Sequence, residues 1–285
     1  MADSGYAAGK VALITGSSRG IGRTLALALA AQGGSVVVNY KQNAELAAEV
    51  VEAVAAAGGR AIAVQADIED PEQIAGLFAA AREEFGRLDY FVSNAAASSF
   101  KSIRDLGVHN LDRSYAMNVR AFVLGAQQAV ELMDRGGRIV VLSSYGSIRA
   151  YPTYANLGAA KAAVEAWVRY MAVEWAPLGI NVNAVNGGII ESDSSAYFYE
   201  VEGMPDLERD VLPKIPKARQ GSVKEVANCV EFLLEPRSEY VTGHSLVVDG
   251  GLSLIAPPFF DDATGPLRLP EREDAGDAAP AAPDA

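Results

Sequence analysis

Short apolar segments alternate with longer stretches of helical composition along most of the chain. The apolar segments are residues 10–15, 35–39, 61–65, 88–92, 138–142, 180–185 and 245–248. The first stretch that is expected to be helical ends at Gln32. The others are residues 44–57, 71–85, 111–133, 155–175 and 224–234. Runs of Val, Ile and Leu are typical of strands that are buried on both faces. The alternation therefore predicts an α/β fold: a single doubly wound, Rossmann-like parallel sheet of about seven strands.

Small or polar residues follow several of these expected strands. They are Gly16, Asp67, Asn94, Ser144 and Gly187. In a parallel sheet, ligands bind beyond the carboxyl ends of the strands. These residues are therefore expected to meet at one site.

A glycine-rich turn separates the first expected strand from the first expected helix. Gly16, Gly20 and Gly22 have the spacing of a tight strand-to-helix connection. Glycines allow the sharp turn, and the helix N-terminus offers free N–H groups to an anion. The turn predicts a pyrophosphate site, although a structural turn alone would have the same spacing.

Tyr154 and Lys161 are seven residues apart at the start of the 155–175 helix. Seven residues return to within roughly 20° of the same helix face, so the two side chains should be neighbours. A nearby ammonium favours the phenolate and lowers the pKa of a phenol. The pair could therefore serve as an acid or oxyanion holder at a carbonyl, or be an ordinary surface pair on an amphipathic helix.

Length and charge restrict the domain organisation and the partners. Residues 1–260 should form one dinucleotide-binding and catalytic domain, in which residues 189–220 are a substrate lid. Residues 261–285 contain two Arg and seven Asp or Glu, and we expect a disordered acidic tail there. The net charge of −12 argues against nucleic acid or an anionic membrane as a partner. A single cysteine and the lack of a long apolar run predict a cytoplasmic location.

The motifs jointly resemble those of the short-chain dehydrogenase/reductase family. They occur in the family's order at residues 15–22, 67–68, 93–96, 117–119, 143–144, 161, 181–185 and 248–251. The resemblance covers roughly residues 10–254. It implies a seven-stranded parallel sheet that binds a nicotinamide cofactor.

The spacing of the phenol departs from the common pattern of that family. Most members have Tyr four residues before the Lys, where this chain has Leu157. The separation of Tyr154 and Lys161 is similar to that of the enoyl-thioester reductase branch. This resemblance implies NADPH-dependent reduction of the carbon–carbon double bond of an enoyl-CoA or enoyl-ACP, including alicyclic substrates such as 1-cyclohexenylcarbonyl-CoA. It makes Tyr154 the group that binds the thioester oxygen and Lys161 the group that binds the nicotinamide ribose. Ser144 would assist at the carbonyl, and Asn118 would support Lys161.

The cofactor residues also follow from the resemblance. They are Gly16, Ser18, Arg19, Gly20, Ile21, Gly22, Lys41, Asp67, Ile68, Asn94, Ala95, Ala96, Lys161 and Gly187. Residues 39–41 contain no acid that would bind a ribose 2′-hydroxyl. Arg19 and Lys41 could instead hold a 2′-phosphate, which favours NADPH, unless both cations are simply solvated.

Other readings of the sequence remain open. A ketoreductase or alcohol dehydrogenase could use Tyr154 or Tyr151 in an unusual geometry, and a non-catalytic protein could bind NADP without consuming it. Residues 197–199 are aromatic and could line an acyl pocket, while Lys214, Lys217 and Arg219 could meet phosphates. No metal site is expected. Apolar surface on several sides of the 155–175 helix predicts a homodimer or homotetramer.

Overall fold

A computed structural model describes residues 5–134, 136–201 and 204–255 of the chain. The predicted acidic tail at residues 261–285 lies outside these residues. Within them, no helix is both long enough and apolar enough to cross a membrane.

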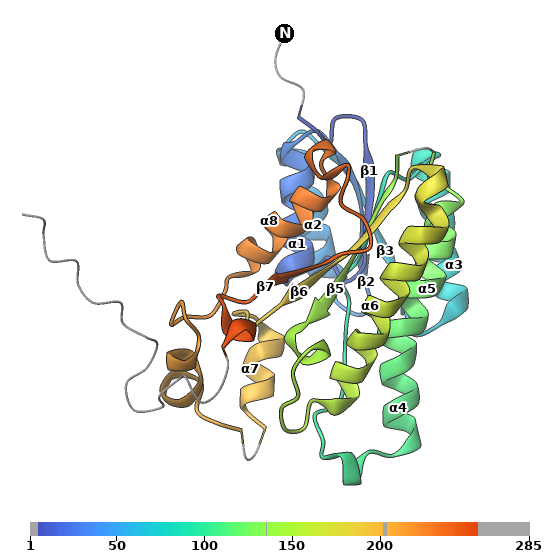
Figure 1. The fold of residues 1–285 in the computed structure, drawn as a ribbon. Helices are drawn as coiled ribbons and strands as arrows, with labels where there is room; N and C mark the ends of the chain where they lie inside the picture. The colour runs from blue at the N-terminus through green and yellow to red at the C-terminus, as the bar shows by residue number, and fades with distance from the viewer. Residues whose placement is uncertain (1–4, 135, 202–203, 256–285) are drawn as a thin grey trace, which may run out of the picture.

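One parallel sheet forms the centre of the fold and confirms the predicted α/β class (Figure 1). Its strands are β1 (Val11–Ile14), β2 (Ser35–Tyr40), β3 (Arg60–Gln65), β4 (Tyr90–Ser93), β5 (Arg138–Ser144), β6 (Asn181–Gly187) and β7 (Ser245–Val248). They pair in the order β3-β2-β1-β4-β5-β6-β7. The central strands β1 and β4 are buried throughout, as continuous apolar runs in parallel sheets usually are.

Helices cover both faces of the sheet (Figure 1). They are α1 (Gly20–Ala31), α2 (Ala44–Ala56), α3 (Pro71–Phe85), α4 (Val108–Tyr115), α5 (Ala121–Val130), α6 (Ala155–Trp175), α7 (Asp193–Tyr199) and α8 (Val223–Leu234). Buried residues of α1, α2 and α8 form one apolar cluster with the sheet, and those of α3, α5 and α6 form a second cluster on the opposite face. The sheet is thus desolvated from both sides.

The helical region expected at about residues 111–133 is present, with ends that differ by three residues. Helix α4 begins at Val108, α5 ends at Val130, and a π-helical turn, η2 (Ala116–Arg120), lies between them. Asn118 lies in this π-helical turn and is 2 % exposed. Single π-helical turns inside α-helices occur often at functional sites, and no periodicity in the sequence marked this one.

The order of strands reverses direction between β1 and β4. Such a switch point opens a crevice beyond the carboxyl ends of the two strands. Gly16 follows β1 and Asn94 follows β4, so both lie at this crevice.

Candidate active site

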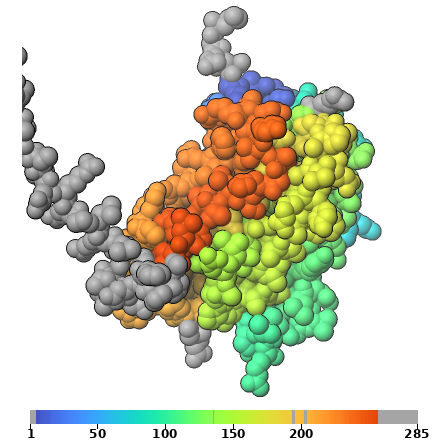
Figure 2. Space-filling view, viewed as in Figure 1, coloured from blue at the N-terminus to red at the C-terminus, as the bar shows by residue number. Residues whose placement is uncertain are grey.

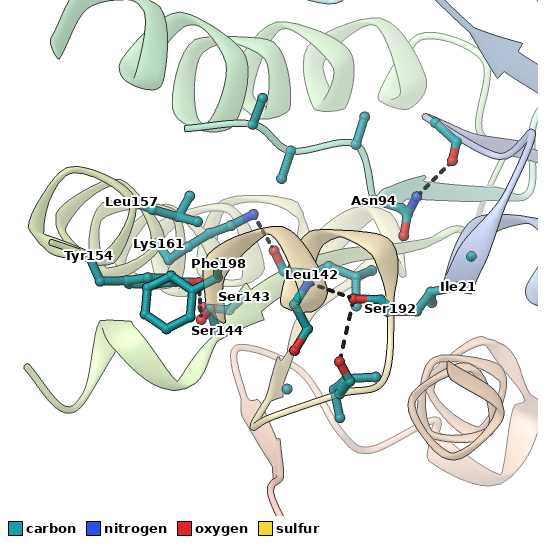
Figure 3. A pocket seen from close by; sticks show the side chains of 18 of the residues that line it. Ile21, Asn94, Leu142, Ser143, Ser144, Tyr154, Leu157, Lys161, Ser192 and Phe198 are labelled. Carbon is teal, nitrogen blue, oxygen red and sulfur yellow. Dashed lines mark hydrogen bonds between the residues drawn. The ribbon is translucent and has the colours of Figure 1, made fainter. Parts of the chain in front are cut away.

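A cavity of about 1090 Å³ lies over the carboxyl ends of the strands (Figure 3). Most of the predicted site residues line it: Gly16, Ser18, Arg19, Gly20, Ile21, Lys41, Asp67, Ile68, Asn94, Ala95, Ala96, Ser144, Tyr154, Lys161 and Gly187. Gly22 and Asn118 are the predicted site residues that do not line it. The cavity lies at the upper end of the volumes typical of ligand pockets, which suits a ligand as large as a dinucleotide.

The glycine turn brings the N-terminus of α1 into this cavity. Gly16 and Gly20 have φ values of 62° and 57°, which side chains rarely adopt. A Cβ at Gly22 would lie 2.8 Å from Asn94 Nδ2, so only glycine allows this close approach. Asn94 Nδ2 donates to the carbonyl oxygens of Thr15, at 2.9 Å, and Gly16, at 3.1 Å.

Helix α1 has no side-chain cap at its N-terminus, whereas Asn43, Asp70 and Ser222 cap α2, α3 and α8. The first N–H groups of an uncapped helix are free to bind an anion, and the helix dipole favours one. The end of α1 can therefore bind a phosphate group.

Charged side chains gather at the end of the cavity near β2. Lys41 Nζ lies 2.7 Å from Asp67 Oδ2 and 3.1 Å from Glu69 Oε1. Arg113 Nε lies 3.2 Å from Glu69 Oε2. Burial is the largest single effect and opposes ionisation of Asp67. The hydrogen bonds from Lys41 and the Glu69 amide and the charges of Lys41 and Arg113 together outweigh it, so the pKa of this carboxyl is lowered. Glu69 and Arg113 were not singled out from the sequence.

Tyr154 lies directly before α6 and forms a hydrogen bond with Ser144. The two hydroxyl oxygens are 2.8 Å apart (Figure 3). Burial raises the pKa of Tyr154, and hydrogen bonding with Ser144 and Tyr151 only partly offsets this. The prediction that Lys161 lowers this pKa is therefore wrong. Desolvation dominates, so the neutral phenol is favoured, and either hydroxyl of the Tyr154–Ser144 pair can be the donor.

Lys161 projects from α6 towards the end of β5. Its Nζ donates to the carbonyl oxygen of Leu142 at 2.7 Å (Figure 3). Burial lowers the pKa of Lys161 to about 8, and the charge of Glu165 opposes this shift. Tyr154 is at the N-cap position of α6, directly before the first helical residue, so the expected helix face shared with Lys161 stays a prediction.

Two glycines allow the chain to pack closely around the ring of Tyr154. A Cβ at Gly146 would lie 2.5 Å from the Tyr154 ring, and a Cβ at Gly158 would lie 2.6 Å from the carbonyl oxygen of Gly146. Thr153, the residue before the phenol, has a φ of 63°. This region is strained for a β-branched residue, and such strain often occurs at functional sites.

Asn118 holds the chain next to the cavity. Its Nδ2 donates to the carbonyl oxygens of Ala97 and Ser114, both at 2.9 Å. Its Oδ1 is buried and has no hydrogen-bond partner within the described part of the chain. The expected support of Lys161 by Asn118 stays a prediction.

Aromatic side chains form the wall next to Tyr154. Phe198 of α7 packs edge-on against the rings of Phe100, Tyr151 and Tyr154, at centroid distances of 5.0, 5.7 and 5.6 Å. The segment at residues 189–220 also contributes Ile190, Ser192, Met204 and Lys214 to the cavity. Phe100 was not predicted, because it lies in an irregular segment far from Phe198 in the sequence.

Comparisons with known proteins agree with this geometry. The model of the enoyl-(acyl carrier protein) reductase family matches residues 16–253. The 1-cyclohexenylcarbonyl-CoA reductase of Streptomyces collinus is 65% identical over 263 residues, which are 92% of this chain and 94% of that protein. Versicolorin reductase 1 of Aspergillus parasiticus is 39% identical over 259 residues, 88% of this chain and 99% of that one.

A solved structure has the same fold. A short-chain dehydrogenase from Burkholderia cenocepacia in complex with NADP superimposes with a TM-score of 0.81 at 35% identity. The match covers 87% of this chain and 99% of that one. Fold, site geometry and sequence identity lead to the same conclusion, and the chain belongs to the short-chain dehydrogenase/reductase family.

Proposed function

We propose that this protein reduces the carbon–carbon double bond of an α,β-unsaturated acyl-CoA thioester with NADPH. The position of the phenol carries the proposal. Leu157, where most family members have the acidic Tyr, lines the cavity and cannot donate a proton. Tyr154 is instead paired with Ser144 at 2.8 Å. The relative that is 65% identical is named for the reduction of a cyclic enoyl-CoA.

The residues that line the cavity fit nicotinamide adenine dinucleotide phosphate. The uncapped N-terminus of α1 suits the pyrophosphate. Arg19 and Lys41 line the cavity near the end of β2, where no acid follows Asn39, so a 2′-phosphate would meet cations. Lys41 is bound to Asp67 and Glu69 in this structure, and it would exchange these carboxylates for the phosphate. NADP is bound in the related Burkholderia structure.

The chain's own groups then have defined tasks. The bound cofactor would supply a hydride for the β-carbon of the substrate. Tyr154 donates a hydrogen bond to the thioester oxygen, where negative charge develops. Ser144 orients this phenol. Lys161 would hold the ribose hydroxyls of the bound cofactor. The apolar wall excludes water from the developing enolate.

The aromatic wall supports a cyclic acyl group. Phe100, Tyr151 and Phe198 lie around Tyr154 and offer flat apolar surfaces to a six-membered ring. Residues 189–220 would act as the substrate lid, since helix α7 carries Phe198 onto this wall. The rest of the described chain forms the cofactor-binding and catalytic body. We further propose that the protein is a homo-oligomer and is cytoplasmic.

The direct test is NADPH oxidation with crotonyl-CoA, acetoacetyl-CoA and 1-cyclohexenylcarbonyl-CoA in parallel, with product masses. We expect a saturated product from the cyclohexenyl substrate, and slower or no turnover of acetoacetyl-CoA. Turnover of acetoacetyl-CoA alone would identify a ketoreductase. NADPH binding without turnover of any of the three would contradict the proposed activity.

A Tyr154→Phe variant tests the role of the phenol. Loss of one hydrogen bond to a developing oxyanion lowers kcat by roughly 10²- to 10³-fold. NADPH binding should stay within about twofold, because the phenol does not contact the phosphate end. The control is Tyr240→Phe, which removes the hydroxyl of a fully exposed tyrosine. Full enoyl reduction by Tyr154→Phe would remove this residue from the mechanism.

A further inference from the structure

We propose that Glu165 is a positioning residue that supplies the buried counter-charge for Lys161 and holds the turn at residues 143–147 against α6. Glu165 lies four residues after Lys161 on α6, so both side chains lie on one side of the helix. Both are buried, with 4% of Lys161 and 8% of Glu165 exposed. Charged side chains are almost never buried this deeply unless they are paired.

Three donors converge on one oxygen of Glu165. Ser143 Oγ, Ser147 Oγ and Asn186 Nδ2 all donate to Oε1, the last two at 2.7 and 2.8 Å. Asn186 Nδ2 also lies 2.8 Å from Ser147 Oγ. These donors come from β5, from the turn after it and from β6. One carboxylate thus ties α6 to the two strand ends that carry Ser144 and Gly187.

Three groups that can donate a hydrogen surround Oε1 of Glu165, an arrangement that suits a carboxylate as their common acceptor. They are the hydroxyls of Ser143 and Ser147 and the side-chain amide of Asn186. Hydrogen bonds to the charged form of a carboxylate stabilise that form. Yet all three donors are neutral, so none of them balances the negative charge.

Lys161 is the cation that can balance it. Its own hydrogen bond goes to the neutral carbonyl of Leu142. Among the described residues, the phenols of Tyr145, Tyr151, Tyr154 and Tyr199 line the same cavity as Lys161. The elements β5, β6 and η2 carry the neutral side chains Ser143, Ser144, Asn186 and Asn118. Glu165 is the charged group that raises the pKa of Lys161 against the effect of burial. The carboxylate therefore helps to keep the ammonium charged near neutral pH.

The consequence concerns cofactor binding, and in this respect the inference rests on the proposed function. A protonated Lys161 donates to ribose hydroxyls more strongly than the neutral amine. The affinity for NADPH should then fall as the pH rises through about 8, where Lys161 loses its proton. Removing the negative charge lowers that pKa further, so the fall should begin at a lower pH.

The test is the dissociation constant of NADPH, followed by fluorescence from pH 6 to 9, in Glu165→Gln. The alkaline limb is the part of the pH profile in which the affinity for NADPH falls as the pH rises. We expect the midpoint of this limb to move down by about one pH unit, which is the lower end of the effect of a close charge on a pKa. At pH 8 the dissociation constant would rise about fivefold, and at pH 6 it would match the unmodified protein. Glu174→Gln, an exposed position on the same helix, is the matched control and should leave the limb in place.

Glu165→Asp separates charge from packing. It retains the negative charge, so its alkaline limb should stay where it is even if the turn is weakened. An unmoved limb in Glu165→Gln, or an equal loss of affinity at every pH, would overturn the proposal. If Glu165→Gln does not fold, a displaced alkaline limb in Glu165→Asp would overturn the proposal instead, because this variant keeps the negative charge. The binding measurement needs no acyl substrate, so it stands even if the protein reduces something other than an enoyl thioester.

Discussion

Thr153 holds a strained backbone conformation directly before the proposed catalytic phenol. Its φ of 63° lies in the left-handed region, and its Oγ1 is buried without a hydrogen-bond partner within the described residues. Left-handed backbone costs a residue with a Cβ roughly 1–2 kcal/mol, and asparagine tolerates it best. We expect Thr153→Asn to raise the free energy of unfolding by about 1 kcal/mol, measured by urea denaturation.

A second threonine provides the control for this substitution. Thr24 lies within α1, where the backbone is helical and the propensities of Thr and Asn are close. Thr24→Asn should change stability by less than about 0.5 kcal/mol. Equal effects at both positions would show that Thr153 stores no strain. A stabilised Thr153→Asn with lower kcat would show that this strain helps to place Tyr154.

The identity of these single residues could be predicted from the sequence better than their geometry. Tyr154, Lys161 and Ser144 do lie together at the cavity. However, the phase argument assumed that Tyr154 is inside α6, and the phenol precedes the first helical residue. Helix ends are where ideal periodicity fails. Glu165 was missed because its donors, Ser143, Ser147 and Asn186, come from segments up to 22 residues away, and local patterns do not show such contacts.

Helix α5 packs against β4 through a glycine. A Cβ at Gly125 would lie 2.7 Å from the ring of Phe91. Gly125→Ala should therefore destabilise the protein by about 1–3 kcal/mol, because the buried ring has little room to move. The same substitution at Gly76 in α3 is the control, since a Cβ there meets no atom within 4 Å.

The two glycine substitutions should have opposite signs. Gly76→Ala should stabilise the protein by about 0.5–1 kcal/mol, because alanine has the better helix propensity and loses less backbone entropy. Thermal unfolding of both variants at one pH is sufficient to measure this. If Gly125→Ala is as stable as Gly76→Ala, the contact between α5 and β4 is looser than the structure shows.

The strands were predictable because a strand that is buried on both faces has a continuous run of Val, Ile and Leu in the sequence. All seven occur in the structure, with ends that differ by a few residues. The break between α4 and α5 was not predictable. Within the π-helical turn at Ala116–Arg120, Asn118 donates a hydrogen bond to the carbonyl oxygen of Ala97, which is 21 residues away in the sequence. Helical composition continues through it without a Gly or Pro.

The outer surface of the molecule carries apolar side chains on two helices that contact each other. On α6, Tyr170 and Val173 are 74% and 79% exposed. On α4, Val108 is 74% exposed and Tyr115 is 53% exposed. In Figure 2, α6 runs along the surface in yellow, with the green region of α4 below it. The two groups lie towards different ends of α6, because α4 contacts α6 at Asn156, in its first turn. Exposed apolar side chains on one helix, such as Tyr170 and Val173, suit an interface between subunits.

We therefore expect a mass of two or four times the chain mass of 29.9 kDa, measured by light scattering after size exclusion. The double variant Tyr170→Glu/Val173→Glu should have a lower mass and an unchanged far-UV spectrum, because a charge is costly to bury between subunits. Ala75→Glu/Ala79→Glu on the exposed face of α3 adds the same charge elsewhere and should leave the mass unchanged. A monomeric unmodified protein, or an unaffected α6 variant, would contradict this interface.

The inner side of α6 carries Lys161 and Glu165, so a partner packed on its outer side would also stiffen the helix that holds the proposed catalytic groups. The α6 variant should then lose thermal stability as it loses mass.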